Sequence, residues 1–390
     1  MARATNKKGS GGGDSPKDLS KIRKKYPSYI NAETFYQDMG SRLRLPNRIM
    51  GLNYQTGGGI VYGTIVEIAG YESTGKSLIA KDYAYAAQQL GGMVLWVDAE
   101  RCFDFLWAEQ NGLDRNKIEL LRTEEIEVIS DWVRDMILYW RAKLTNNEPI
   151  LLVCDSIAAL ETADNIKADA IGGKAEMGNR AKAIYQFYRR RNNLIDKYGV
   201  CVAMINQVRK KVGATLYEAA ETMPGGDSTK FYASFRIMLN RSKQVKGYKS
   251  RDGKWNDSID KGVKIGQNII VEVLKNKTAP PRPKFKTEVY FLPDKYDYVG
   301  YNKYAGIKEM GEYMGIITSK GSRYYYKDEQ ICNGEKNFID ALHEKSKLRR
   351  RIIKALGINT ISNFQERLES IGKNLYPVKA KKSEDEGEDE

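Results

Sequence analysis

The chain is poor in the residues that build metal sites and nucleophile triads. Its 390 residues include one histidine, His343, and four cysteines that form no C-x-x-C pair. A multi-histidine metal site therefore cannot form, a Ser-His-Asp hydrolase is disfavoured, and structural zinc is not expected. Three of the cysteines lie in or beside apolar runs, which favours buried free thiols in a reducing compartment.

Long apolar runs are also missing. The longest ones, such as 150–153, are far shorter than the roughly 20 residues that span a membrane, and no apolar signal segment follows Met1. Hydrophobic residues make up 41% and charged residues 29% of the chain, as in a globular soluble protein. We therefore expect a cytoplasmic protein of two or three domains with no membrane partner.

Positive charge is in excess, with a net charge of +14. This excess favours a polyanionic partner, nucleic acid first and an anionic membrane second. Residues 1–25 hold eight Lys or Arg against two Asp, together with a Gly/Ser run, whereas the last eight residues hold six acids. We expect a basic flexible segment over 1–40, with a short helix between Asn31 and Leu45, and a disordered acidic tail over 377–390.

Short apolar runs alternate with helical patterns over 41–293. This order predicts an α/β fold whose mainly parallel sheet is covered on both faces. The predicted strands are 65–69, 93–97, 150–154 and 200–205, and the predicted helices are 77–90, 123–145 and 179–198. Later strands at 235–239, 269–274 and 287–292 can extend the sheet with antiparallel members. Residues 294–376, rich in tyrosine and glycine and then in basic helical sequence, predict a small α/β C-terminal domain.

A phosphate-binding loop is predicted at Gly70–Ser77, which matches G-x-x-x-x-G-K-[ST] between a strand and a helix. Backbone N–H groups of such a loop and the following helix N-terminus bind phosphate oxygens. Lys76 would reach the β- and γ-phosphates and Ser77 would ligate Mg²⁺. The predicted ATP-binding residues here are Gly70, Glu72, Ser73, Thr74, Gly75, Lys76, Ser77 and Leu78. A chance glycine turn is the alternative, which the flanking strand and helix disfavour.

Three further predicted strands end in polar side chains. Because the carboxyl ends of parallel strands meet at one edge of a sheet, these side chains should lie near the loop. Asp155 would hold Mg²⁺, Glu100 would orient and deprotonate water, and Gln207 would contact the γ-phosphate or that water. A helix cap and a surface acid are the alternatives for Asp155 and Glu100. The long basic segment 208–226 that follows is typical of functional or disordered loops.

These pieces, in this order and spacing, resemble the RecA family of recombinases. Other matching segments are Cys154–Leu160, Ile205–Arg209, Gly225–Gly226, Lys230–Ser234 and Lys275–Lys277, between about Gly57 and about Leu342. The resemblance implies a RecA-type P-loop core and a DNA-dependent ATPase using ATP and Mg²⁺. It also implies a helical filament on single-stranded DNA that pairs with homologous duplex DNA during recombination and repair, with single-strand-binding and mediator proteins as partners.

The resemblance also assigns roles to single residues. Glu100 would be the catalytic base, and Gln207 would link the nucleotide state to DNA. Asp104 and Trp107 match positions that contact adenine, although the family usually has tyrosine where this chain has Trp107. Lys275 and Lys277, two apart on a predicted strand, match catalytic lysines that reach the ATP of the neighbouring protomer. Without the resemblance, two solvated strand lysines would be the simpler interpretation.

Two loops, Asn165–Glu176 and Val208–Gly226, match family segments that contact single-stranded DNA. The helix after the first loop places Ile184, Phe187, Tyr188 and Ile195 on one face, predicted to be core, and Lys182 and Arg189 on the other. A solvated basic face is the alternative for these two. The DNA-binding residues that the resemblance implies are Met177, Lys182, Arg189, Arg209, Lys210, Lys211, Val212, Gly225 and Gly226.

Some positions depart from the family pattern. Ile270 and Glu272 stand where the family has a basic strand face for the second DNA, and a neighbouring basic pair is reduced to Arg241. Capture of a duplex is therefore in doubt, or moves to the basic stretch 243–254. Two other functions stay open: a ring-forming helicase or translocase on the same core, and a DNA-binding accessory protein with a vestigial ATP site. The intact Lys76, Ser77, Glu100 and Asp155 speak against the last.

Overall fold

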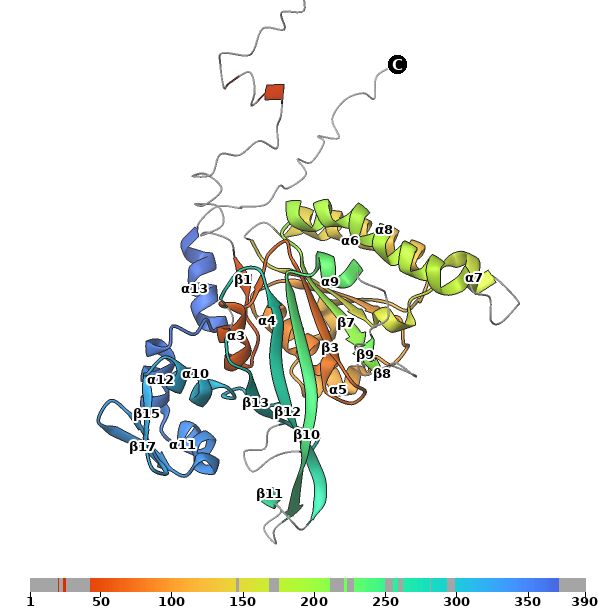
Figure 1. Ribbon diagram of the computed structural model, residues 1–390. Coiled ribbons are helices and arrows are strands. Elements are labelled where there is room, and N and C mark those ends of the chain that lie inside the picture. The colour runs from red at the N-terminus through yellow and green to blue at the C-terminus, as the bar shows by residue number, and fades with distance from the viewer. Residues whose placement is uncertain are drawn as a thin grey trace, which may run out of the picture. The chain divides into compact units, whose positions relative to one another are not determined.

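The computed structural model describes residues 20, 24–25, 43–144, 147–167, 175–210, 221–222, 228–249, 255–258, 262–280, 282–292 and 299–371. The predicted acidic tail and most of the predicted N-terminal segment lie outside these residues. The predicted short helix between Asn31 and Leu45 falls almost entirely outside these residues as well. The described chain resumes there with strand β1 (Arg44–Leu45), which pairs with β2 (Ile60–Val61). From Arg44 onward the chain belongs to one unit, shown in Figure 1.

The unit is built on a ten-stranded sheet with the path β14-β13-β12-β10-β3-β7-β6-β4-β5 and β11 paired to β10 (Figure 1). Strands β10, β3, β7, β6, β4 and β5 run parallel, and β12, β13 and β14 join by antiparallel pairing. The predicted α/β fold with a mainly parallel sheet is therefore confirmed. The parallel strands are β3 (Ile65–Gly70), β4 (Met93–Asp98), β5 (Ile118–Leu121), β6 (Ile150–Asp155), β7 (Cys201–Gln207) and β10 (Phe235–Lys249).

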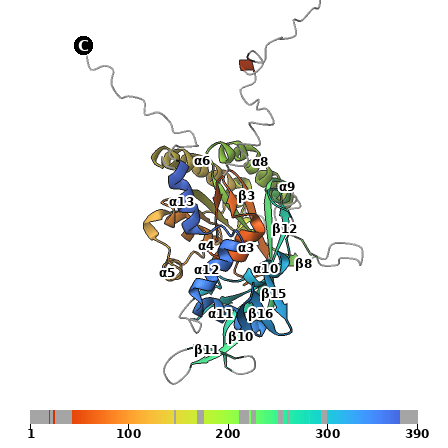
Figure 2. The same cartoon turned by 90° about the vertical axis from the view of Figure 1, so that its left-hand side faces the viewer.

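Helices cover the sheet because each presents an apolar stripe to it. Helices α6 (Ile126–Lys143) and α8 (Ala175–Lys197) lie side by side along one face (Figures 1 and 2). Helix α4 (Lys76–Gln89) packs against β4, β6 and β7 from the other side. The four predicted core residues of α8 are all buried: Ile184, Phe187, Tyr188 and Ile195. Shorter helices are α3 (Met50–Thr56), α5 (Phe105–Gln110), α7 (Ala163–Lys167) and α9 (Ser228–Tyr232).

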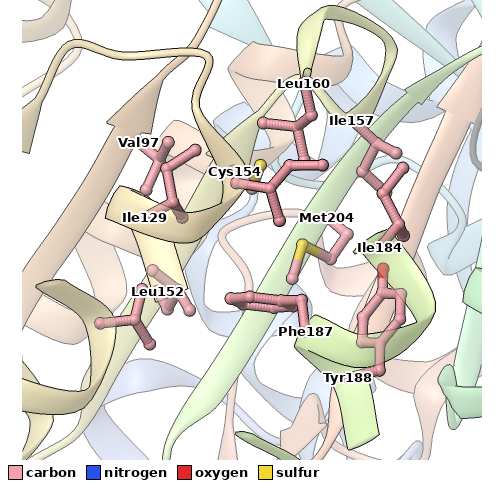
Figure 3. A pocket seen from close by; sticks show the side chains of 12 residues that line it. Val97, Ile129, Leu152, Cys154, Ile157, Leu160, Ile184, Phe187, Tyr188 and Met204 are labelled. Atoms are coloured by element: carbon pink, nitrogen blue, oxygen red, sulfur yellow. The ribbon is translucent and has the colours of Figure 1, made fainter. Parts of the chain in front are cut away.

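The core under α6 and α8 contains a narrow apolar cavity of about 20 Å³, shown in Figure 3. Met204 of β7 lies there beside Phe187 and Tyr188 of α8 (Figure 3). This space is too small and too apolar for a nucleotide, so it is part of the packed core. Cys154 lines it as a free thiol, and burial raises the pKa of that thiol well above its usual range. Cys201 and Cys332 are likewise buried and free, as predicted, whereas Cys102 is exposed.

Strands β10 and β12 are longer than the sequence predicted, with 15 and 14 residues. Beyond Leu239, which pairs with Gly70, they continue with β11 (Trp255–Ser258) as an arm past the carboxyl edge of β3. A bulge separates Arg241 from Gln244, and the buried Gln267 amide donates to the carbonyls of Ser242 (2.8 Å) and Lys243 (3.0 Å). The arm begins at the edge where the predicted ATP residues lie.

Antiparallel strands β12 (Val263–Asn276), β13 (Phe285–Tyr290) and β14 (Gly300–Tyr301) complete the sheet. After them, a cluster of buried residues from Tyr304 to Ile358 packs together with Tyr54 of α3. Its elements are α10 (Ile307–Tyr313), α11 (Phe338–Glu344) and α12 (Ser346–Ala355), with a three-stranded sheet of β15 (Ile317–Lys320), β16 (Arg323–Tyr326) and β17 (Glu329–Asn333). Helix α13 (Ile361–Ile371) follows, and the ring of its Phe364 lies 6.1 Å from that of Tyr62. The predicted domain boundary at 293/294 therefore precedes the last strand of the large sheet. In the part of the chain that the structure describes, no helix has the length and apolar character needed to cross a membrane.

Candidate functional site

The predicted phosphate loop joins β3 to α4. Ser73 (φ 55°) and Gly75 (φ 82°) adopt left-handed backbone conformations, and α4 begins directly afterwards at Lys76. A Cβ on Gly75 would lie 2.3 Å from the Tyr301 hydroxyl, so only glycine fits there. The first N–H groups of a helix have no partners within the helix. The loop and the start of α4 therefore have the geometry of an anion-binding site.

Lys76 lies among acidic side chains at this edge. Its ammonium group donates to the carbonyl of Tyr71 at 2.7 Å. Burial lowers the pKa of Lys76, and the nearby carboxylates of Asp155, Glu100 and Glu72 oppose that shift. The Lys76 ammonium group therefore interacts with the carboxylates that the sequence predicted for the same site.

Asp155 ends β6 and faces the start of α4. Its carboxylate accepts a hydrogen bond from the Ser77 hydroxyl, while burial, with Glu100 and Asp98, raises the pKa of Asp155 to about 6. No group of three or more His, Cys, Asp or Glu side chains suited to a metal occurs among the described residues. A hydroxyl and one carboxylate suit Mg²⁺ that shares its other ligands with phosphate and water.

This raised pKa predicts a pH dependence for metal-dependent nucleotide binding. Asp155 must be ionised to ligate a cation, so the affinity for ATP with Mg²⁺ should fall as the pH drops through about 6. The limiting loss is about tenfold per pH unit, since one proton competes. Titration with a fluorescent ATP analogue at pH values from about 5 to about 8 measures this affinity. Asp155→Asn should bind weakly at every pH, and a steep profile in that variant would contradict the assignment.

Glu100 and Gln207 are in direct contact although β6 separates their strands. The N–H groups of Ala99 and Glu100 donate to the Asp155 carbonyl at 2.9 and 3.3 Å, which sets the chain direction after β4. The Gln207 amide donates to Glu100 Oε1 at 2.9 Å, and the Ser156 hydroxyl donates to the same oxygen. Sequence reasoning gave Ser156 no role, although it directly follows Asp155. The candidate base is therefore held by the residue directly before the second predicted DNA loop.

A cleft of about 510 Å³ brings most of the predicted nucleotide residues together. This volume is in the range of ligand sites. Asp104 does not line the cleft; instead its carboxylate caps α5 by accepting the Trp107 N–H at 3.1 Å. The lining includes three residues that were not predicted to bind the nucleotide, Ile205, Val289 and Phe291, together with Glu72, Ser73, Gly75, Lys76, Ser77, Leu78, Glu100, Trp107, Asp155 and Gln207.

Tyr301 contacts the phosphate loop, although the sequence did not predict a role for it. It belongs to β14, more than two hundred positions after the phosphate loop, yet its buried hydroxyl lies 3.0 Å from the Thr74 carbonyl and 3.2 Å from that of Gly75. Burial raises the pKa of Tyr301 well above its usual value, so the hydroxyl stays a donor. Its position in a tyrosine-rich stretch gave no signal of this contact.

Tyr301→Phe should weaken nucleotide binding about three- to tenfold, because the loop carbonyls lose a buried donor whose net worth is about 1 kcal/mol. Equilibrium titration with ATP and thermal unfolding measure the two effects. Tyr290→Phe is the matched control, since its hydroxyl donates to Glu288 at 3.2 Å on β13. Equal nucleotide affinity in both variants would show that Tyr301 does not support the loop.

Known proteins are similar in sequence to this chain over most of its length. The family model described as the RecA N-terminal domain matches residues 44–293. The chain belongs to the RecA family. Protein RecA of Nitratiruptor is 31% identical over 304 residues, which are 78% of this chain and 80% of the relative. Protein RecA of Aquifex aeolicus is 29% identical over 306 residues (78% and 80%), and that of Mesomycoplasma hyopneumoniae strain J is 33% identical over 296 residues (75% and 78%).

The DNA residues implied by the RecA resemblance are only partly within the described chain. Lys182 and Arg189 are exposed on α8, on the side away from its buried residues. Met177 lies in the first turns of α8, and Arg209–Lys210 form β8, paired with β9 (Glu221–Thr222), so the second loop has a short ribbon at its base. Four predicted residues lie outside the described residues: Lys211, Val212, Gly225 and Gly226.

The predicted trans-acting lysines lie away from the chain's own cleft. Lys275 pairs across the sheet with Arg236, near the amino end of β10, and its ammonium donates to the carbonyls of Lys230 (2.6 Å) and Phe231 (3.3 Å). The prediction that both lysines belong to one strand is wrong for Lys277, because β12 ends at Asn276. The two cations still interact, since Lys277 helps to lower the pKa of Lys275, after burial.

The arm concentrates exposed positive charge near the cleft. Ile270 and Glu272 lie on β12 opposite Asn240 and Met238, so no basic face forms at these positions. Arg241, Lys243 and Lys264 are exposed on the arm. The Lys264 ammonium lies 5.4 Å from the ring centre of Phe291, which lines the cleft.

Proposed function

We propose that this chain is a DNA-dependent ATPase that polymerises on single-stranded DNA and catalyses homologous pairing and strand exchange in recombination and repair. Membership of the RecA family supports a recombinase role and the binding of a nucleotide with Mg²⁺. The observation that carries the proposal is the 2.9 Å hydrogen bond between Gln207 and Glu100. It joins the residue directly before a predicted DNA loop to a carboxylate of the nucleotide cleft.

In this proposal, the cleft residues have separate roles in ATP hydrolysis. Lys76 and the loop N–H groups would neutralise phosphate charge, and Ser77 with Asp155 would hold Mg²⁺, which supplies further neutralisation when bound. Glu100 would take the proton of the attacking water as its oxygen bonds to the γ-phosphorus and ADP leaves. Gln207 would report the presence of the γ-phosphate to the loop that begins after it.

Self-assembly follows from the position of the lysine pair. Lys275 and Lys277 lie beside the amino end of β3, whereas the phosphate loop follows its carboxyl end, so they would serve the cleft of a neighbouring copy. Such a contact joins two different surfaces and propagates into a helical filament. Phe231, 72% exposed beside Lys275, gives this surface an apolar contact residue. Single-strand-binding and mediator proteins are the further partners in the proposal.

The DNA strand would lie along α8 and the two loops. Changing Lys182 and Arg189 together to Ala should reduce the salt dependence of single-stranded DNA binding, because two phosphate contacts are lost. The expected change in the slope of log K against log salt is about 1.4, from about 0.7 per contact. Fluorescence anisotropy at several salt concentrations measures the slope. Lys320→Ala with Arg323→Ala removes the same charge from exposed positions on β15 and β16 and is the control. Equal slopes in both variants would remove Lys182 and Arg189 from the site.

The homologous duplex is assigned to the arm. Arg241, Lys243, Lys246 and Lys264 supply the positive charge that Ile270 and Glu272 do not provide. The bulge fixed by Gln267 interrupts the alternation of the strand at Ser242 and Lys243, and Arg241, Ser242, Lys243 and Gln244 are all exposed. A second polyanion would therefore meet exposed positive charge on the arm.

A joint-molecule assay with ATP, a single strand and a homologous duplex tests the proposal. We expect joint molecules that require both ATP and homology, and filaments in electron micrographs of the same sample. A heterologous duplex is the control. Closed rings that unwind duplex without forming joint molecules would favour the helicase alternative, and DNA binding that ignores ATP would favour the accessory protein.

A further inference from the structure

A buried acid interrupts the apolar strand β3. Glu67 is 0% exposed and lies in the middle of the sheet, between Ile65 and Ala69 on the same face. Burial of an ionised carboxylate is costly unless hydrogen bonds and an opposite charge compensate it. The nucleotide site as described makes no use of Glu67, so its presence needs a reason.

Both oxygens of Glu67 are bonded, each to a different neighbouring strand. Arg236 of β10 donates its Nε–H to Oε2 at 2.5 Å. Asn206 of β7 donates its amide to Oε1 at 2.8 Å. Strand β3 lies between β10 and β7 in the sheet, and Arg236 is the register partner of Glu67. One carboxylate thus ties three adjacent strands together.

On the β7 side these contacts lead into the nucleotide cleft. The Asn206 side-chain carbonyl accepts the backbone N–H of Gln207 at 3.0 Å, and the Gln207 amide donates to Glu100. Asn206 can offer its carbonyl to Gln207 only while its NH₂ group faces an acceptor on the other side. Glu67 is that acceptor, so it fixes which way round the Asn206 amide lies.

On the β10 side the same contacts lead to the lysine pair. Arg236 is the register partner of Lys275 across β10 and β12, and the charge of Arg236 helps to lower the pKa of Lys275, after burial and Lys277. Met204 of β7 is the register partner of Glu67, so the two side chains lie on the same face of the sheet. Met204 packs under α8 against Tyr188 (Figure 3). The contacts are therefore shielded from water, where charge interactions are strongest.

We propose that Glu67 is a positioning residue that couples the Lys275–Lys277 pair to Gln207. The inference rests on the proposed function, because it takes the lysine pair to bind a phosphate of the neighbouring copy. Binding that phosphate relieves the repulsion between Lys275 and Arg236 and changes how Arg236 holds Glu67. Glu67 transmits the change to the Asn206 amide, and thereby to Gln207 and the DNA loop. Coupling of this kind is reciprocal, so DNA binding also influences the lysine pair.

Glu67→Gln tests the coupling with almost no change in shape. Its carbonyl can still accept from Asn206, but its amide cannot accept from Arg236. The readout is the ratio of single-stranded DNA affinities measured with a non-hydrolysable ATP analogue and with ADP. We expect this ratio to fall about tenfold in the variant, while the affinity for the ATP analogue itself changes less than about twofold. A merely structural role would lower the thermal stability without changing the ratio.

Two further variants make the result decisive. Asp82→Asn is the matched control: Asp82 is equally buried and paired with Arg48 at 2.6 Å, on α4 and away from Gln207, so the ratio should stay at the wild-type value. Glu67→Gln combined with Arg236→Gln replaces the ion pair by a neutral pair. This double variant should recover the thermal stability but not the wild-type ratio of DNA affinities. It replaces the single variant in the test if Glu67→Gln alone does not fold. A wild-type ratio in that double variant would overturn the inference. If the wild-type protein itself shows no dependence on nucleotide, the proposed function fails instead.

Discussion

Glu100→Gln should lower DNA-stimulated ATP turnover by about a hundredfold to ten-thousandfold and leave DNA binding with ATP intact. A glutamine at this position has nearly the same shape, and its carbonyl can still accept from Gln207 and Ser156 as the carboxylate does. What it cannot do is take a proton from the attacking water. Steady-state phosphate release with and without single-stranded DNA measures turnover, and anisotropy measures binding.

The control for this variant removes a carboxylate outside the cleft. Glu124 pairs with Arg101 at 2.9 Å at the surface, so Glu124→Gln should retain full turnover. Since Gln207 would report the loss of the γ-phosphate to the DNA loop in the proposed function, Glu100→Gln complexes with DNA should also dissociate more slowly after ATP addition. Unchanged turnover would show that another group accepts the proton, and a joint loss of turnover and DNA binding would show that Glu100 supports the fold of the cleft.

Strands β3, β4, β6 and β7 could be predicted because each is buried on both faces. Runs such as Ile150–Asp155 and Cys201–Gln207 are apolar throughout and stop at a polar residue, which gives both the strand and its end. Strand β5 (Ile118–Leu121) escaped prediction because it is a half-buried edge strand that contains Glu119. The arm escaped for a related reason: its strands leave the sheet, lose their apolar faces and look like loop in the sequence.

The same reasoning explains which site residues the sequence indicated. Lys76, Glu100, Asp155 and Gln207 all follow predicted strands, and parallel strands must end at one edge, so their proximity follows from topology alone. Tyr301 arrives from β14, whose place beside β13 depends on antiparallel pairings between distant segments. No periodicity in the sequence encodes such a contact.

Glu67 illustrates a different limit of sequence reasoning. Its acidic type within an apolar run is visible in the sequence, but its partners Arg236 and Asn206 come from strands that lie far apart along the chain. The order of strands in the sheet, with β3 between β10 and β7, decides which polar groups can meet it. That order follows from the crossover connections of the whole domain and not from any local pattern.

Changing Lys275 and Lys277 together to Ala should reduce DNA-stimulated turnover about a thousandfold, since a trans-acting cation contributes at least that much to phosphoryl transfer. Nucleotide binding by the isolated chain should persist, because neither lysine lines the chain's own cleft. Lys275 also holds the carbonyls of Lys230 and Phe231, so a loss of activity alone does not separate a trans role from damage to α9.

Mixing two inactive variants makes that separation. In a filament of Glu100→Gln and lysine-pair variants, some interfaces join an intact Glu100 from one protomer to intact lysines from the next. Random mixing at equal amounts gives roughly a quarter of such interfaces, because each heterologous contact draws on two independent protomers. We therefore expect the mixture to regain up to roughly a quarter of wild-type turnover, although each variant alone is inactive. A mixture as inactive as its components would mean that the lysines act within their own chain, and the nucleotide would then not be shared between neighbouring copies.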